Sequence, residues 1–266
     1  MAVFASKINT SSETYLRQRA EMLELVDKLN ELNSRGRAIS EKRKPRFDKR
    51  GQLTPRERLA RLLDPGMPFL EIGNLAGYKL DTKDEAKSIP GGTVISGIGF
   101  ISGVRCCVVV DDSGILAGSL TLAGGYRIAR AQQISLEQRL PFVHLVESAG
   151  GDLMNYTVEN FAEGGDLFGA LAKLSKEGIP VISILHGSST AGGAYMPGLS
   201  DYVIAVKGTG RAFLAGPPLL KAATGEIATE EELGGSEMHA TTSGLAEYLA
   251  ENDGHGIQIC REVVAR

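Results

Sequence analysis

Near the middle of the chain, a run of small residues follows an apolar segment in a pattern that favours chemistry by backbone groups. Residues 181–186 predict a buried strand, residues 187–190 a turn, and residues 191–194, Ala-Gly-Gly-Ala, the start of a helix. A helix that begins at such a turn leaves backbone N–H groups without partners, and negative charge is favoured beside them. The pattern indicates a place to hold a developing oxyanion. The alternative is that the glycines only permit close packing.

A second Gly-rich turn follows the preceding predicted strand. Residues 142–147 predict that strand, and residues 148–152 read Ser-Ala-Gly-Gly-Asp. From residue 112 onward strands alternate with helices, which predicts an α/β fold with a largely parallel sheet and right-handed crossovers. Because ligands bind at the carboxyl ends of parallel strands, the two turns can meet at one oxygen atom of a ligand. This arrangement favours the functional interpretation over packing alone.

Few groups near these turns can transfer a proton. The candidates are Glu147, Asp152, His186 and Asp201, with weaker support for Glu226 and His239. Glu147 and His186 each end a predicted strand, so we expect both to be buried structural groups. The motifs GxSxG, HExxH, GxxxxGK[ST] and a complete GxGxxG are absent. The turns therefore predict stabilisation of an enolate, with the proton chemistry handled elsewhere.

The composition is that of a globular protein with an uneven charge distribution. The chain has 266 residues, 42% of them hydrophobic, and no apolar run approaches the roughly 20 residues of a membrane span. The N-terminus shows no signal peptide, so we expect a cytoplasmic protein without a membrane segment. Three cysteines and four scattered histidines predict neither a disulfide framework nor a metal site. Residues 1–61 hold 15 Lys and Arg against 8 Asp and Glu.

That basic segment has three interpretations. The plainest is a solvated face, and the others are contact with a phosphate-bearing ligand or with an acidic neighbouring subunit. Nucleic acid is disfavoured because no aromatic residues interleave the charges.

We expect an N-terminal helical arm over residues 1–68 and one larger domain over residues 69–266. In the arm, the pattern predicts a helix over 11–34, a loop over 41–51 and a helix over 55–63, with both helices outside the main core. In the domain, it predicts a loop over 78–90, a hairpin that turns at Ser102-Gly103, and strands and helices to the end. The predicted strands lie at 93–102, 104–111, 142–147, 181–186, 202–206 and 213–216, and the predicted helices at 126–139, 160–177, 191–199, 217–223, 230–235 and 252–266.

Several stretches together resemble the carboxyltransferase β chains of biotin-dependent acyl-CoA carboxylases. They are residues 51–59 (GQLTPRERL), 148–152 (SAGGD), 187–197 (GSSTAGGAYMP), 213–226 (FLAGPPLLKAATGE), and 232–239 (ELGGSEMH) with Ser243-Gly244. The run AGPPLLKAATGE is most similar to the branch that contains methylcrotonyl-CoA and geranyl-CoA carboxylases. The resemblance covers about residues 15–266.

This resemblance implies a crotonase-like (ClpP/crotonase) α/β fold with repeated ββα units and N-terminal helices. It also implies that acyl-CoA binds here, with its thioester oxygen in an oxyanion hole of backbone N–H groups. By position these belong to Gly150 or Gly151 and to Gly193, with Gly192 beside it. The substrate-binding residues expected around them are Ser148, Ala149, Thr190, Ala191, Tyr195, Gly118 and Ser119. Ala149 stands where many members carry Gly, which does little harm because only its N–H is needed.

The resemblance further implies that carboxybiotin supplies the carboxyl group and acts as the base. No Met-Lys-Met biotinylation motif is present, so we expect biotin on a separate chain, in a biotin carboxylase or biotin carrier subunit. Crotonase-type hydratases keep a catalytic Glu where this chain has Met196, which argues against hydratase activity. The alternatives left open are a propionyl-CoA or acetyl-CoA carboxylase, a biotin-linked decarboxylase subunit, and a non-catalytic CoA-binding domain.

Family chains have a second, homologous half that binds biotin and supports homo-oligomers, whereas this sequence stops at Arg266. We expect the isolated first half of a longer protein, with a natural split subunit as the alternative. Such a half should bind acyl-CoA weakly and transfer no carboxyl group alone. We also expect Gly193→Val to weaken enolate chemistry in the full enzyme without unfolding it.

Overall fold

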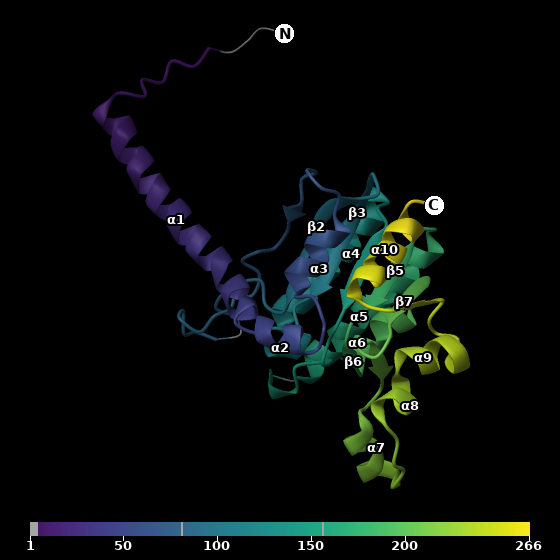
Figure 1. Ribbon diagram of the computed structural model, residues 1–266. Helices are drawn as coiled ribbons and strands as arrows, with labels where there is room; N and C mark the ends of the chain where they lie inside the picture. Colours follow the sequence, from purple (N-terminus) through teal and green to yellow (C-terminus); the bar gives the residue numbers. More distant parts are fainter. Residues whose placement is uncertain (1–4, 81, 156) are drawn as a thin grey trace.

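A mixed sheet of seven strands, covered by helices on both faces, forms the centre of the molecule (Figure 1). The computed structural model describes residues 5–80, 82–155 and 157–266. In spatial order the strands are β1 (Leu70–Glu71), β2 (Val94–Ile101), β3 (Val104–Asp111), β4 (Phe142–Val146), β5 (Val181–Leu185), β7 (Tyr202–Val206) and β9 (Tyr248–Ala250). Strands β3 to β9 are parallel, as predicted, and β1 to β3 are antiparallel.

Alternating side chains divide the core into two apolar layers, one on each face of the sheet. In β3, Val108 and Val110 face the layer of α3 (Pro55–Leu62) and α10 (Asp253–Val264). Cys107 and Val109 face the layer of α4 (Leu122–Gln138) and α5 (Val158–Lys176), which α6 (Gly192–Gly198) joins through Met196. The sheet is therefore buried on both faces.

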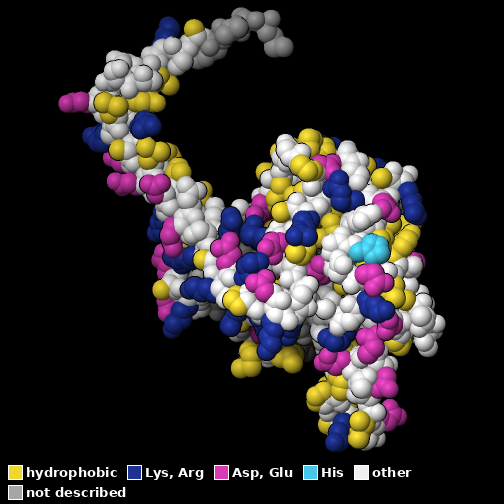
Figure 2. Space-filling view, viewed as in Figure 1, with side chains coloured by type: hydrophobic (Ala, Val, Ile, Leu, Met, Phe, Trp, Pro, Cys, Tyr) yellow, Lys and Arg dark blue, Asp and Glu magenta, His cyan; other side chains and the backbone are white. Residues whose placement is uncertain are grey.

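The remaining elements lie around this sandwich. They are α1 (Glu13–Glu41), α2 (Lys44–Lys49), α7 (Pro217–Thr224), α8 (Glu230–Gly234), α9 (Ser236–Met238), the short helices η1 (Leu116–Gly118), η2 (Leu153–Asn155) and η3 (His239–Ser243), and a small parallel pair of β6 (Ser188–Thr190) with β8 (Arg211–Phe213). The N-terminal part of helix α1 stands clear of the body while its C-terminal end meets it, and α7 projects at another side (Figure 1). Figure 2 shows apolar and charged side chains mixed along α1.

The N-terminal helices differ from the prediction in length and number. Helix α1 begins after Ser12, whose hydroxyl accepts a hydrogen bond from Tyr15 N, but it continues past the predicted end at residue 34, through Gly36 to Glu41. At Gly36 a side chain would lie 3.3 Å from Pro90 O, so the glycine allows the helix to pack closely against the loop that precedes β2. The predicted loop over 41–51 is wrong, because it contains α2, anchored by the buried ring of Phe47.

Helix α3 begins as predicted, with Thr54 and Glu57 in a reciprocal capping box. Its expected position outside the core is wrong: Leu59 and Leu62 are 5% and 0% exposed and belong to the core beneath α10. Two buried leucines three residues apart lie on one face of an amphipathic helix. The helix has only eight residues, which is too short for the hydrophobic periodicity to reveal that face in the sequence.

Within the sandwich the predicted elements are present with shifted ends. The hairpin turns at Ser102-Gly103, both with positive φ. The turn predicted over 187–190 contains β6, and β9 was not predicted. The helix predicted over 230–235 is α8, which ends at Gly234 with Gly235 as its C-cap, at a φ of −72°. The loop predicted over 78–90 is confirmed in the described residues, and Asp81 lies outside them. No helix of the described ranges is long and apolar enough to cross a membrane.

Candidate active site

The two Gly-rich turns lie against each other at the carboxyl ends of β4 and β5. We call residues 148–152 the first turn and residues 187–193 the second turn. Thr190 N donates a hydrogen bond of 2.9 Å to Ser148 O. A side chain at Gly150 would lie 2.6 Å from Thr190 O, and one at Gly193 would lie 2.9 Å from Ser148 O. Glycine is therefore required on both sides of the contact, since β4 and β5 are neighbouring parallel strands.

A third segment, the loop of residues 116–120, completes this region. Ala149 N donates to Ala117 O at 3.1 Å, and Leu120 N donates to Gly150 O at 2.7 Å. Gly118 has a φ of +68°, and a side chain there would collide with the carbonyl of Glu147. These contacts bring Gly118 and its neighbour Ser119 beside the first turn, although 30 residues separate Gly118 from Ser148.

Ser148 holds the three segments together. Its buried hydroxyl donates to Gly118 O at 2.7 Å and accepts from Gly150 N at 3.2 Å, while its carbonyl accepts from Thr190 N. The side chain is 1% exposed and its hydrogen-bonding capacity is used within the chain. In this structure Ser148 shapes the turns and does not present its hydroxyl to solvent.

The backbone N–H groups of the turns fall into two sets. Those of Ala149 and Gly150 are bound to oxygens of the chain. Those of Gly151, Gly192 and Gly193 have no acceptor among the residues that the structure describes. Gly151 is exposed, Gly192 is half-buried and Gly193 is buried. The three unpaired donors are thus supplied by two turns in direct contact.

Ala191, the residue before α6, has an unusual backbone conformation. Its φ of 49° and ψ of −116° match the first central position of a type II′ turn, which glycine normally occupies. A non-glycine residue held there costs of order 1–3 kcal/mol and persists only where its surroundings enforce it. The conformation turns the chain sharply from β6 into α6, which leaves the N–H groups of Gly192 and Gly193 at the start of the helix.

Apolar side chains border the second turn. The Tyr195 ring is 52% exposed and packs on Phe168 of α5, with the ring centroids 5.1 Å apart. At Gly192 a side chain would touch both Phe168 and Leu120 at ordinary contact distances. Met196 is 1% exposed and belongs to the core. The position one turn after the glycine pair therefore offers no carboxylate.

The close packing at Gly193 corrects one expectation. Valine there would place Cβ 2.9 Å from both the carbonyl oxygen and Cβ of Ser148, which is closer than real side chains come. The two turns would have to separate, so we no longer expect Gly193→Val to leave the fold intact. At Gly151 an added methyl group would meet nothing within 4 Å, so this position has room for a larger side chain.

Most of the predicted acids and bases have structural roles. Glu147 and His186 are buried, as expected. Asp201 does not lie near the turns: it accepts from Val181 N, at the opposite end of β5. Asp152 accepts from Met154 N and from the Asn155 amide within its own loop.

The two weaker candidates also lie apart from the turns in their contacts. His239 bonds to Ala212 O and to the Ser243 hydroxyl, 2.8 Å from each. Glu226 is exposed just after α7. Neither contacts the first or second turn in the hydrogen bonds of the described residues.

Two buried charged partners of Glu147 and His186, Arg58 and Asp253, were not predicted. The Arg58 guanidinium bonds to Glu147 Oε2 at 2.5 Å and to Asp253 Oδ2 at 3.0 Å, and Asp253 Oδ1 lies 2.7 Å from His186 Nδ1. Arg58 falls on the face of α3 that carries Leu59 and Leu62. A charged residue on an apolar helix face was the available signal for a buried ion pair.

The charges of this cluster are coupled. Burial alone would lower the pKa of Arg58, but the carboxylates of Glu147 and Asp253 raise it above its usual value. Burial and the charge of Arg58 lower the pKa of His186, which favours the neutral ring. Although burial opposes ionisation, the contacts with His186 and Arg58 lower the pKa of Asp253 to about 2. Because this carboxylate can only accept, Nδ1 of His186 carries the ring proton.

The cysteines are free and buried. Burial raises the pKa of Cys106 and Cys107 to about 12, so neither is a reactive thiolate. Among residues 5–80, 82–155 and 157–266, no group of three or more His, Cys, Asp or Glu side chains is arranged to hold a metal ion.

Known proteins are similar to this chain in sequence and in fold. The chain is 43% identical over 262 residues to a probable biotin-dependent acyl-coenzyme A carboxylase beta2 subunit of Mycobacterium tuberculosis, covering 98% of this chain and 48% of that protein. It is 38% identical over 266 residues to a probable methylcrotonoyl-CoA carboxylase beta chain of Drosophila melanogaster, covering 99% and 46%. The chain thus spans about half the length of these relatives.

A solved structure agrees with them. The beta subunit of P. aeruginosa geranyl-CoA carboxylase superposes with a TM-score of 0.91 at 48% identity, over 99% of this chain and 49% of that one. The fold is accordingly the crotonase-like fold that the resemblance implied. The family model of the carboxyl transferase domain matches residues 46–266. The two contacting turns lie within that match, and the chain belongs to the carboxyl transferase domain family.

Proposed function

We propose that this chain is the acyl-CoA-binding half of a biotin-dependent carboxyltransferase, which moves a carboxyl group from carboxybiotin to an acyl-CoA enolate. The observation that carries the proposal is the set of unpaired N–H groups of Gly151, Gly192 and Gly193 in a member of the carboxyl transferase family. Donors fixed before the reaction stabilise negative charge on a thioester oxygen without reorganising. Because Gly150 N is already bonded to the Ser148 hydroxyl, Gly151 is the better first-turn donor.

The other site residues take positions around this oxygen in the proposal. The backbone on either side of the thioester oxygen is that of Ala149, Thr190 and Ala191. The backbone behind the first turn is that of Gly118 and Ser119. Tyr195, with its exposed ring against Phe168, is suited to contact an apolar acyl group. Ser148 acts through its hydrogen bonds to Gly118 and Gly150.

The base at the α-carbon is proposed to come from outside this chain. Among the described residues, Glu147 and His186 are buried in ion pairs and hydrogen bonds beneath the turns, and Asp201 lies at the other end of β5. That arrangement fits a reaction in which carboxybiotin, carried on a separate chain, supplies both the carboxyl group and the basic atom. The residues of this chain bind the thioester, polarise its carbonyl group and hold the enolate.

The acyl group proposed is methylcrotonyl or a similar branched, unsaturated chain. The relatives named for methylcrotonoyl-CoA and geranyl-CoA carboxylases support this choice. We further propose a biotin carboxylase or biotin carrier subunit as partner, a homo-oligomeric enzyme and a cytoplasmic location. The division into an arm of residues 1–68 and a domain of residues 69–266 is also proposed, with α3 as the part of the arm that docks on the domain.

A paired substitution tests the site. Gly151→Val places a branched side chain in open space beside one unpaired N–H. Gly198→Val places the same side chain in open space at the far end of α6, away from the three donors. We expect Gly151→Val to weaken binding of 3-methylcrotonyl-CoA about tenfold or more, a loss of about 1.4 kcal/mol. Calorimetric titration measures it. Gly198→Val should bind like the parent chain, and equal affinities for all three proteins would contradict the proposal.

A further inference from the structure

A continuous chain of buried polar contacts runs beneath the two turns. It passes from Glu147 to Arg58, from Arg58 to Asp253 and from Asp253 to His186, over distances of 2.5, 3.0 and 2.7 Å. The four side chains are at most 8% exposed. They come from four separate places in the fold: α3, the residue after β4, the residue after β5 and the N-terminus of α10.

Both ends of this chain are joined directly to the turns. Glu147 precedes Ser148, and its backbone N–H is held by Asp111 Oδ2 at 3.1 Å. The Glu147 side chain crosses the base of the second turn so closely that a Cβ on Gly187 would collide with its carboxyl group. A movement of the Glu147 carboxylate is therefore transmitted to both turns.

The second turn is fixed from its other side. His186 precedes Gly187, its ring is held by Asp253, and its carbonyl accepts from the Gln52 amide at 3.0 Å. Asp253 Oδ2 also accepts from Leu53 N at 2.7 Å. The segment before α3 thus contacts the same two groups that anchor the second turn.

Burial of so many charges is poorly explained by stability alone. Apolar residues of similar volume stabilise a core as well as a buried ion pair does. Helices α3 and α10 already pack through Leu59, Leu62 and Ile257 in the same layer. What the ionic contacts add is direction, because the guanidinium fork fixes two carboxylates at set angles, which a hydrophobic contact cannot do.

We infer that Glu147, Arg58, Asp253 and His186 are positioning residues that set the distance and angle between the first and second turns. None of them touches the thioester; they act through Ser148 and Gly187. The inference rests on the proposed oxyanion site, because it concerns the alignment of the N–H groups of Gly151, Gly192 and Gly193.

The test follows the thioester carbonyl directly. The 266-residue chain is titrated with 3-methylcrotonyl-CoA labelled with ¹³C at that carbon, and the ¹³C resonance of the bound ligand is measured. In the parent chain the resonance should move downfield, because hydrogen bonds polarise the C=O bond. In Arg58→Lys, one ammonium cannot reproduce the two-carboxylate fork. We expect its downfield shift to fall to about half and its affinity for the labelled thioester about tenfold.

Free coenzyme A, which lacks the thioester, separates alignment from general damage. Its affinity should stay within about twofold of the parent value in Arg58→Lys. Should that variant not fold, Arg58→Met combined with Glu147→Gln and Asp253→Asn replaces the guanidinium and both of its carboxylates by neutral groups, which buried sites tolerate better than an unpaired charge. This triple variant should show the same reduced shift.

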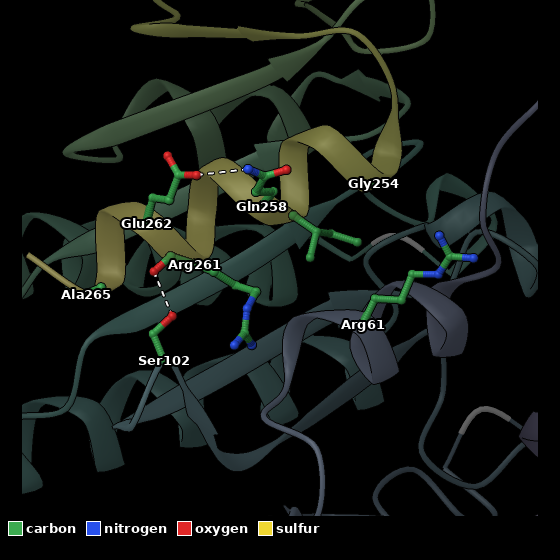
Figure 3. A pocket seen from close by; sticks show the side chains of 8 residues that line it. Arg61, Ser102, Gly254, Gln258, Arg261, Glu262 and Ala265 are labelled. Atoms are coloured by element: carbon green, nitrogen blue, oxygen red, sulfur yellow. Dashed lines mark hydrogen bonds between the residues drawn. The ribbon is translucent and has the colours of Figure 1, made fainter.

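Arg261 provides the matched control. Its guanidinium also ties α10 to the α3 region, through Leu62 O at 2.6 Å and Asp64 Oδ1 at 2.8 Å, but it lies beside Ser102 in the groove between α3 and α10 (Figure 3). Arg261→Met should lower the unfolding midpoint and keep the full ¹³C shift.

Three outcomes are decisive. A reduced shift in the Arg58 variants with a full shift in Arg261→Met supports the inference. A full shift in folded Arg58 variants overturns it while leaving the oxyanion site standing. No binding and no shift in the parent chain overturns the proposed function itself, and the inference with it.

Discussion

The first and second turns follow neighbouring strands and are both rich in glycine, yet they are built differently. The first turn is hydrogen-bonded to the 116–120 loop, and its Gly150 adopts a φ of +86° that suits glycine. The second turn has its strain on an alanine, Ala191, and opens directly into α6. The first turn is thus fixed by hydrogen bonds to an adjacent loop. The second turn supplies N–H donors and is held in place by the residues around it.

This difference shows that some backbone amides of the site hold the turns in place while others remain free to bind a ligand. Two of the three amides at residues 149–151 are used to fix the first turn, which leaves Gly151 as its free donor. The second turn pairs with β8 through β6, with Ala191 N donating to Phe213 O at 3.1 Å, and leaves two adjacent donors. Its geometry therefore depends on β8, on contacts with the first turn and on the buried groups beneath it.

The largest expected effect comes from adding a methyl group where the turns meet. Gly150→Ala forces an L-residue to a φ of +86° and places Cβ 2.6 Å from Thr190 O. We expect a loss of about 3 kcal/mol in the free energy of unfolding, from strain and overpacking together. Gly103→Ala, with a φ of +80° and open space, should cost only about 1 kcal/mol. Denaturant titration compares them, and equal losses would show that the turns are not in tight contact.

Acid should weaken the support of the second turn through Asp253. Its folded-state pKa of about 2 lies below the value of about 3.9 expected when unfolded. The stabilisation is therefore complete above pH 4 and is lost as the pH falls toward 2. The loss is roughly 2.5 kcal/mol. Asp253→Asn should flatten this part of the stability profile, whereas Asp27→Asn, on exposed α1, should not; identical profiles would exclude Asp253 as the cause.

The bracing of the first turn is tested by removing one hydroxyl. Ser148→Ala leaves the buried Gly118 O and Gly150 N without a partner, which should cost about 2 kcal/mol in the free energy of unfolding. Ser34→Ala, where the hydroxyl bonds to Glu31 O on exposed α1, should change it by less than about 0.5 kcal/mol. If both changes were small, the first turn would not depend on Ser148.

The smallest effect should be a gain. Ala191→Gly relieves a conformation that alanine rarely adopts, and the gain should exceed the added entropy of the unfolded chain, for a net stabilisation of about 1 kcal/mol. Ala117→Gly, at a φ of 53° and ψ of 30° in the ordinary left-handed region, should give little or no gain. Thermal unfolding distinguishes the two variants. A destabilised Ala191→Gly protein would mean that the second turn is not strained.

Both turns could be predicted from the sequence because each is a local pattern. An apolar strand followed by small residues is visible within a dozen positions, and parallel neighbours bring such ends together. Strands β6 and β9, of three residues each, are too short to show a period. The crowding at Gly193 could not be predicted, because its contact with Ser148 arises only when two strands pair.

The ionic groups beneath the turns could not be predicted for a different reason. Arg58 is 89 residues from Glu147 and 195 residues from Asp253 along the chain. No local period connects them, and each alone is an ordinary charged residue. Only the fold, which places α3 and α10 on the same face of the sheet, brings them together.

The projection of helix α1 has a consequence for which part of the protein unfolds locally first. Almost every residue from Glu13 to Glu31 is exposed, and burial begins at Leu32. Most helical stability in proteins comes from the packing of a buried face, which this segment lacks, so we expect its outer turns to exchange amide hydrogens by local fraying, independently of the sheet. Protection should therefore rise stepwise along α1 and reach that of the core only past Leu32, where the helix meets the body of the protein.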